Sequence, residues 1–309
     1  MSTTAETQNL PEKVDPLLVG ALKALRPKQW AKNVFLFAAL IFSLKFTETT
    51  AWLQTLIGTA SFSLLASTGY LFNDARDVEA DRQHPKKRKR PIASGSLPLR
   101  AAYLEMAITF TAGVGLAYAL SPQFLAVAML YFITTISYSF YFKHIVILDV
   151  MFLAACYIWR AAAGAVAIDV AISPWLFTCT AFISLFLGFN KRRGELLMLR
   201  QQGSNAVTRK NLRQYTPELV VEFQSITTSG TIISYALYCV LGSPTPWMLL
   251  TLPYVLYGIF RYIYLVSVQA EGDAPDETLL SDRPILITGI LYVLTVIIVL
   301  GLHMQGLLD

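Results

Sequence analysis

Charged residues are scarce in this chain of 309 residues. Asp, Glu, Lys and Arg make up 15% of the sequence, whereas hydrophobic residues make up 55%. Ordinary soluble proteins carry about a quarter charged residues. The long uncharged runs that result cannot be buried in one soluble core, so they exclude a water-soluble globule and intrinsic disorder. The composition predicts an all-α integral membrane protein.

Cysteine and histidine are also rare, with three residues of each. Cys156, Cys179 and Cys239 lie in apolar runs and lack CxxC spacing. This pattern excludes a disulfide framework and a zinc site of ordinary spacing. The histidines are scattered and share no ligand spacing, so we assign them no metal.

Nine apolar runs are long enough to cross a bilayer as helices, because about 20 apolar residues span the hydrocarbon core. They are residues 33–51, 52–72, 101–120, 123–142, 145–168, 174–188, 221–241, 247–268 and 285–302. We expect them to form one transmembrane domain over residues 17–309, preceded by a disordered N-terminus at residues 1–16. Polar connections of appreciable length fall at residues 73–100, 190–220 and 269–284.

Basic residues are distributed unevenly across this topology. If the N-terminus is cytoplasmic, every Lys and Arg except Lys45 and Arg160 falls on the cytoplasmic side. The positive-inside rule therefore predicts a multi-pass protein of the plasma (inner) membrane with its N-terminus and site loops in the cytoplasm. Such loops also contact anionic membrane lipids. We expect no nucleic-acid binding, because the cations are spread over membrane-proximal loops and interleaved with carboxylates.

A row of acidic residues directly follows the second predicted span. If the helix continues, Asn73, Asp77 and Asp81 are spaced i, i+4, i+8, and Asp74 shares their face. Like charges on adjacent turns repel one another beside hydrocarbon, so we expect a cation between them. Oxygen ligands suit Mg²⁺, which commonly bridges carboxylates to substrate phosphates. The row predicts a magnesium-diphosphate site; the alternative is a solvated loop whose carboxylates pair with neighbouring arginines.

A basic run, residues 84–95, follows the carboxylates. We expect Lys86 and Arg90 in this run to contact substrate phosphates and to close a cap over the site. Pro85 and Pro91 limit helical continuation in the cap.

Residues 73–95 have the form NDxxDxxxDxxxPxKxxRPIASG, which resembles the first signature of the UbiA superfamily of intramembrane prenyltransferases. The resemblance implies an all-helical bundle around a central cavity. In that cavity magnesium ions hold a diphosphate, and a lipid tail leaves through a side opening. The resemblance also implies that Asn73, Asp77 and Asp81 are metal and diphosphate ligands.

The chain departs from the superfamily at its second motif. Where most members carry DxxxD after the sixth span, residues 188–196 read GFNKRRGEL. Three consecutive cations should weaken a second magnesium site and contact phosphate directly. With residues 26–33 and 282–284, this pattern resembles the phosphoribosyl-transferring branch. That resemblance implies transfer of the 5-phosphoribosyl group from phosphoribosyl pyrophosphate to polyprenyl (decaprenyl) phosphate, releasing pyrophosphate, as an early step towards a lipid-linked arabinose donor for cell walls.

The predicted site has two sets of residues. We expect Asp77, Asp81, Asp74 and Lys191 to serve catalysis, the three carboxylates with Asn73 as metal ligands. We expect the substrates to contact Lys28, Lys32, Asn33, Arg76, Lys86, Arg90, Tyr138, Lys143, Arg160, Lys191, Arg192, Arg193 and Glu195.

Some of these residues have a plainer interpretation. Lys28 and Lys32 also fit an amphipathic interfacial helix, and Lys143 fits ordinary anchoring at the membrane surface. Arg160 lies inside a span, where a cation is costly and usually faces a cavity or a partner. Glu195 fits either a ribose hydroxyl or a neighbouring cation.

Two other functions remain open from sequence. The first is a UbiA-type aromatic prenyltransferase that uses a polyprenyl diphosphate donor in a quinone or haem pathway. The second is a transporter of anionic lipids or metabolites, although the chain shows no paired inverted repeats. The oligomeric state is also open, including a homo-oligomer.

Overall fold

The computed structural model describes residues 16–84, 87–171, 173–202, 210–269, 278 and 281–308. The regular elements in this part of the chain are all helices. The longer ones are α3 (Thr49–Arg76), α6 (Leu99–Leu120), α7 (Pro122–Phe140), α8 (Leu148–Ala167), α9 (Pro174–Gln202), α10 (Pro217–Leu237), α11 (Leu252–Tyr264) and α13 (Arg283–Met304). Short helices connect them: α1 (Leu17–Ala24), η1 (Pro27–Leu36), α2 (Phe37–Phe42), η2 (Lys45–Thr47), α4 (Val78–Gln83), η3 (Lys87–Lys89), α5 (Pro91–Ser94), η4 (Phe142–His144), η5 (Lys210–Gln214), η6 (Tyr238–Gly242), η7 (Pro246–Thr251) and η8 (Leu265–Gln269).

Seven helices in the described ranges are long and apolar enough to cross a membrane: α3, α6, α7, α8, α13, α10 continued by η6, and the segment Pro246–Val268 around α11. They match seven of the nine predicted spans. The multi-pass, all-helical fold is thereby confirmed, whereas the number nine is not. The sixth predicted span lies within α9, a helix of 29 residues.

The first predicted span, residues 33–51, is not one helix. A 3-10 helix, η1, leads into the six-residue α2, and the chain then turns at Leu44, whose φ is 64°. Both η1 and α2 pack against α8. A Cβ atom on Gly164 of α8 would stand 2.1 Å from the backbone oxygen of Leu36, so the two backbones are nearly in contact.

Helix ends follow local chemistry. The predicted hairpin at residues 121–122 is present, because α6 ends at Leu120 and α7 begins at Pro122. The hydroxyl of Ser121 accepts from the backbone N–H of Phe124, and Pro122 occupies the first turn, where its missing N–H is harmless. Thr216 and Asp282 cap α10 and α13 in the same way.

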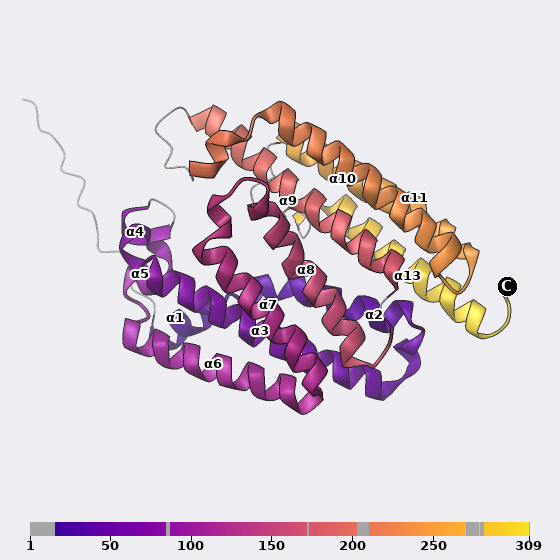
Figure 1. Ribbon diagram of the computed structural model, residues 1–309, viewed down its shortest axis with the longest axis horizontal. Helices are drawn as coiled ribbons and strands as arrows, with labels where there is room; N and C mark the ends of the chain where they lie inside the picture. Colours follow the sequence, from indigo (N-terminus) through magenta and orange to yellow (C-terminus); the bar gives the residue numbers. More distant parts are fainter. Residues whose placement is uncertain are drawn as a thin grey trace, which may run out of the picture.

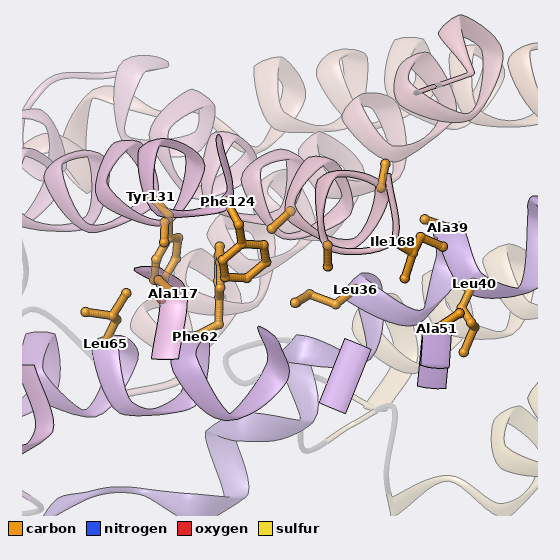
Figure 2. Close-up of a cluster of buried hydrophobic side chains, with 14 of the residues drawn as sticks. Leu36, Ala39, Leu40, Ala51, Phe62, Leu65, Ala117, Phe124, Tyr131 and Ile168 are labelled. Carbon is orange, nitrogen blue, oxygen red and sulfur yellow. The ribbon is translucent and has the colours of Figure 1, made fainter. Parts of the chain in front are cut away.

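The helices form two groups in Figure 1. Helices α3, α6 and α7 lie on one side, α10, α11 and α13 lie on the other, and α8 and α9 run between them. A core cluster inside the first group joins α3, α7 and η1. Figure 2 shows Phe62 facing Phe124 and Tyr131, with Leu36 beside them. The ring centroids of Phe62 and Tyr131 are 4.8 Å apart.

Helix α9 does not stop at the predicted membrane boundary. The sequence predicted a polar connection from residue 190 onwards, but α9 remains helical to Gln202. The basic second motif is therefore on a rigid helix. The end of the bundle that carries this motif also carries α4 and α5 (Figure 1). Most of the third predicted connection, residues 269–284, and the N-terminal residues 1–15 lie outside the described residues.

Candidate active site

The first motif occupies a break in the helix rather than one continuous face. Helix α3 ends at Arg76, Asp77 has φ −94° and ψ 12°, and α4 begins at Val78. The break separates the carboxylates by environment. Asp74 and Asp81 are 3% and 2% exposed, whereas the side chain of Asp77 is 38% exposed.

Arginines hold the two buried carboxylates. Nη2 of Arg26 donates to both oxygens of Asp74, at 2.6 and 2.7 Å. Nη1 of Arg90 donates to Asp74 Oδ1 at 3.1 Å and to Asp81 Oδ2 at 2.7 Å. Arg90 thus closes the cap segment onto the motif. Asp74 follows the alternative interpretation, in which carboxylates pair with arginines, because charged groups so deeply buried need compensation.

Asp77 lies among cations at the surface of the motif. Nε of Arg76 donates to its Oδ1 at 3.0 Å, and Nζ of Lys143 is 3.9 Å from its Oδ2. Partial burial by itself would raise the pKa of Asp77. The hydrogen bond from Arg76 and the charges of Lys143, Arg76 and Lys87 outweigh burial and hold the pKa below its usual value of 3.8. Asp77 is therefore an ionised carboxylate that substrate can reach.

The residues of the first motif fit a magnesium ion in part. Asn73 Oδ1 is buried and has no hydrogen-bond partner in the described part of the chain, and Asp77 is accessible. These two oxygens suit an ion that keeps several water or substrate ligands. Asp81 is paired with Arg90, and Asp74 is paired with both Arg26 and Arg90, so in this arrangement neither carboxylate is open to an ion. No three His, Cys, Asp or Glu side chains of the described residues converge in a metal-holding arrangement, so the predicted four-residue row is not preformed.

The second motif divides into buried and accessible cations. Arg192 is 1% exposed; its Nε lies 2.8 Å from Asp149 Oδ2, and its Nη1 donates to Glu195. Lys191 and Arg193 are only half-buried. Nη1 of Arg193 donates to Gln224 Oε1 at 2.6 Å, and burial lowers the pKa of Arg193 from its usual range. Of the three predicted phosphate cations, the structure leaves Lys191 and Arg193 accessible.

The partner of Arg192 belongs to a wider network. Tyr215 donates its hydroxyl hydrogen to Asp149 Oδ1 at 2.7 Å, and Asn211 Nδ2 donates to Asp149 Oδ2 at 3.0 Å. Burial and the hydrogen bond to Asp149 raise the pKa of Tyr215, so its hydroxyl stays protonated. This network connects the start of α8, the extension of α9, and η5 with the residue that follows it.

Arg160 is buried among neutral partners. Its Nε donates to Asn33 Oδ1 at 2.8 Å, Nη1 to the carbonyl oxygen of Cys156 at 2.8 Å and Nη2 to the Tyr131 hydroxyl at 2.9 Å. Asn33 Nδ2 in turn donates to Ser63 Oγ at 2.8 Å. Arg160 and Asn33 thus connect η1 to α8 and α3. For Arg160 this is the partner that the sequence led us to expect, although the partners are neutral, whereas Asn33 was predicted only as a substrate contact.

A cavity of about 560 Å³ lies between η1, α9, α10, α11 and α13. Its lining is apolar and aromatic, with one charged side chain among the described residues, Lys32. Tyr157, Tyr262 and Tyr292 supply hydroxyl groups to the same lining. Pockets with this composition take mainly apolar ligands, which a few polar groups then orient.

The other predicted residues have simpler positions. Lys28 is exposed on η1, and Tyr138 is half-buried near Arg192. Lys86 lies outside the described residues.

Sequence reasoning missed Arg26, Asn211, Tyr215 and Gln224 as members of the site. Arg26 had been counted only for orientation and within residues 26–33. A positive φ of 53° just before Pro27 and the stacking of its guanidinium on Tyr70 are visible only in three dimensions. The other three had no local pattern, because their partners are 31 to 68 residues away in the chain.

Comparisons with known proteins identify the family of the chain. Residues 34–280 match the UbiA prenyltransferase family. The chain is 35% identical to a decaprenyl-phosphate phosphoribosyltransferase of Corynebacterium glutamicum over 90% of this chain and 86% of that protein. It is 32% identical to the enzyme of the same name from Mycobacterium tuberculosis, over 91% and 94% of the two chains.

A solved structure shares the fold. A UbiA homolog from Archaeoglobus fulgidus, bound to GPP and Mg²⁺, superposes with a TM-score of 0.70 at 18% identity, covering 91% of this chain and 99% of the other. Its likeness concerns the fold alone. The match to the family model covers most of the chain and includes both motifs, and the chain belongs to the UbiA prenyltransferase family.

Proposed function

We propose that this protein transfers the 5-phosphoribosyl group of phosphoribosyl pyrophosphate to a polyprenyl phosphate and releases pyrophosphate. The observation that carries the proposal is the similarity, over nine-tenths of the chain, to relatives named decaprenyl-phosphate phosphoribosyltransferase. The replacement of a DxxxD motif by Lys191, Arg192 and Arg193 supports it, because a substrate with a second phosphate group needs cations as well as a metal.

The two motifs suit the two ends of phosphoribosyl pyrophosphate. The diphosphate at C1 would lie at Asn73 and Asp77, with Arg76 and Lys143 beside it. The separate phosphate at C5 would contact Lys191 and Arg193. A magnesium ion held by Asn73 and Asp77 would supply neutralisation of the charge on the leaving pyrophosphate. These contacts would orient C1 for attack.

The acceptor lipid fits the apolar cavity. The first isoprenoid units of the chain would occupy the lining formed by α9, α11 and α13, and Lys32 would contact the phosphate. A phosphate monoester is ionised at neutral pH, so no strong general base is required. An oxygen of the lipid phosphate forms a bond to C1 as the bond from C1 to the pyrophosphate oxygen breaks, with inversion at C1. Positioning and charge stabilisation by the chain would provide most of the rate enhancement.

We further propose that the site faces the cytoplasm of a plasma (inner) membrane, with anionic lipids around its basic loops. The support is the distribution of Lys and Arg, which leaves only Lys45 and Arg160 outside the cytoplasmic side. Lys45 lies at the other end of the bundle, where its Nζ donates to the carbonyl oxygen of Ile168 at 3.0 Å.

Separate incubations with two pairs of substrates test the reaction. Purified protein in detergent or nanodiscs is incubated with Mg²⁺ and either labelled phosphoribosyl pyrophosphate plus polyprenyl phosphate, or polyprenyl diphosphate plus an aromatic acid. We expect a labelled lipid and free pyrophosphate from the first pair only. Product from the second pair alone would contradict the proposal and favour the aromatic prenyltransferase.

A further inference from the structure

The turn that carries Lys143 is strained. This turn, η4 and the residues up to Ile147, connects α7 to α8 and places Lys143 Nζ 3.9 Å from Asp77 Oδ2. Ile147 has a φ of 70°, a conformation that β-branched residues rarely adopt. Such backbone strain persists only where surrounding contacts enforce it, and it is concentrated at functional sites.

Two side chains from a distant segment hold this turn through its backbone. The hydroxyl of Tyr215 accepts from the backbone N–H of Ile147 at 2.7 Å. Asn211 Nδ2 donates to the carbonyl oxygen of Lys143 at 2.9 Å. One contact is therefore made at the strained residue itself, and the other is made at the residue whose side chain lies beside the first motif.

Both side chains are fixed in turn by Asp149, which accepts from Tyr215 and Asn211. Asp149 is fully buried, and its Oδ2 lies 2.8 Å from Arg192 Nε on α9. We call Asp149, Arg192, Asn211 and Tyr215 the Asp149 brace. The members of the brace are all at least 96% buried, so they are not surfaces that a phosphate contacts. Arg192 is already compensated by Asp149 and Glu195.

We propose that Tyr215 and Asn211 are positioning residues, which act through the brace to hold Lys143 at the place where the substrate diphosphate binds. The inference rests on the proposed function and deepens it. In this arrangement Arg192 stabilises the brace by its ion pair with Asp149 and does not contact phosphate. Through the brace, the second motif on α9 is connected by contacts to the first motif on α3 and α4.

A double-mutant cycle tests whether Tyr215 acts through Lys143. Tyr215→Phe keeps the ring and removes both hydrogen bonds of the hydroxyl. In the native background we expect KM for phosphoribosyl pyrophosphate to rise about tenfold with a much smaller change in kcat, because Lys143 is no longer held in place and Tyr215 and Lys143 are energetically coupled. In a Lys143→Met background the same change should alter KM less than about twofold. Tyr238→Phe is the control. The buried Tyr238 hydroxyl has no hydrogen-bond partner among the described residues, and Tyr238 follows α10, whereas Tyr215 precedes that helix.

A second readout does not depend on catalysis. The full-length protein is treated with a soluble acylating reagent, and the rate of modification of the Lys143 amine is measured by mass spectrometry of its peptides. This rate should increase in Tyr215→Phe and stay unchanged in Tyr238→Phe. Should Tyr215→Phe fail to fold, Asn211→Ala takes its place in both experiments. Unchanged Lys143 labelling, or an equal rise in KM in both backgrounds, overturns the inference. If the native protein makes no phosphoribosyl lipid at all, the proposed function fails, and labelling still decides on the brace.

Discussion

Four polar residues of the first motif look equivalent in sequence and differ in the folded chain. The spacing of Asn73, Asp74, Asp77 and Asp81 predicts one face of a helix. The break at Asp77 instead leaves Asp77 accessible and buries Asp74 between two arginines. Sequence could locate the motif but could not assign these roles, because Arg26 approaches from 48 positions earlier in the chain.

Replacement of Asp74 should reduce stability more than metal affinity. Asp74→Asn removes the counter-charge of Arg26 and one of the two carboxylates that Arg90 contacts, at a cost of about 3 kcal/mol that solvent access to the arginines will moderate. We expect a lower Tm in detergent and a nearly unchanged Mg²⁺ requirement in the protein that remains folded. A large rise in the Mg²⁺ concentration needed for activity, with no fall in Tm, would instead identify Asp74 as a metal ligand.

The ionisation of Asp77 should not limit activity near neutral pH. Its pKa lies below 3.8 in the folded protein. The charged form, with the contacts it makes, is therefore fully present above that value and is lost only as pH falls through the lower folded pKa. We expect no Asp77-dependent change in Mg²⁺-dependent substrate binding from about pH 5.5 to 8.

Lys143→Met removes one of the cations that oppose the effect of burial on Asp77. Loss of binding should then begin at a higher pH than in the native protein, because the pKa of Asp77 rises. Parallel titrations of both proteins cancel the protonation of the substrate itself. Superimposable profiles would show that Lys143 does not interact with Asp77.

At the scale of elements, η1 and α8 make the closest contact at any glycine in the described part of the chain. Gly164 lets the backbone of Leu36 lie against α8, and Arg160 and Asn33 join the same two elements nearby. The residues that follow Arg160, Ala161 to Gly164, are all small, and such residues predict close helix approach. They do not predict that the partner is a 3-10 helix, since that depends on a contact across more than a hundred residues.

An added methyl group at Gly164 should disrupt this contact. Gly164→Ala places a Cβ 2.1 Å from a backbone oxygen that cannot rotate away, so we expect a loss of at least about 2 kcal/mol, seen as a lower Tm. Gly115→Ala on α6 is the matched control, because nothing lies within 4 Å of the added atom. Equal Tm values for the two variants would contradict the packing described for η1 and α8.

The predicted and observed elements agree best where hydrophobicity alone decides. Helices α6, α7, α8 and α13 begin and end within three residues of their predicted bounds. The differences lie at the two motifs and in the first predicted span, residues 33–51, where η1, α2 and η2 replace one long helix. Helix α9 continues past the apolar run, and Arg192 and Glu195 in this continuation are paired inside the protein, a tertiary effect that a hydropathy pattern does not contain.

For the whole molecule, the charge asymmetry makes a prediction about orientation. In a background without native cysteines, Lys45→Cys and Lys89→Cys report on opposite ends of the bundle. A membrane-impermeant maleimide added to intact cells should label position 45 and should label position 89 only after permeabilisation, because basic loops remain in the cytoplasm. The reverse pattern would place the first motif outside the cell and exclude the proposed topology.

The fold and the family could be predicted from this sequence, whereas the side-chain contacts within the site could not. Hydrophobic runs and residues 73–95 are local signals. The brace around Asp149, the pairing of Arg26 with Asp74 and the tie between Arg160 and Asn33 each join segments far apart in the chain. Such contacts leave no periodicity in either partner, so only the folded arrangement reveals them.

Calorimetric titration of phosphoribosyl pyrophosphate into the purified protein tests the central claim most directly. We expect saturable binding by the native protein in Mg²⁺, loss of binding when EDTA replaces Mg²⁺, and at least about a hundredfold weaker binding in Asp77→Asn at unchanged Tm. Binding of equal strength in EDTA, or in Asp77→Asn, would contradict a magnesium-dependent diphosphate site at the first motif.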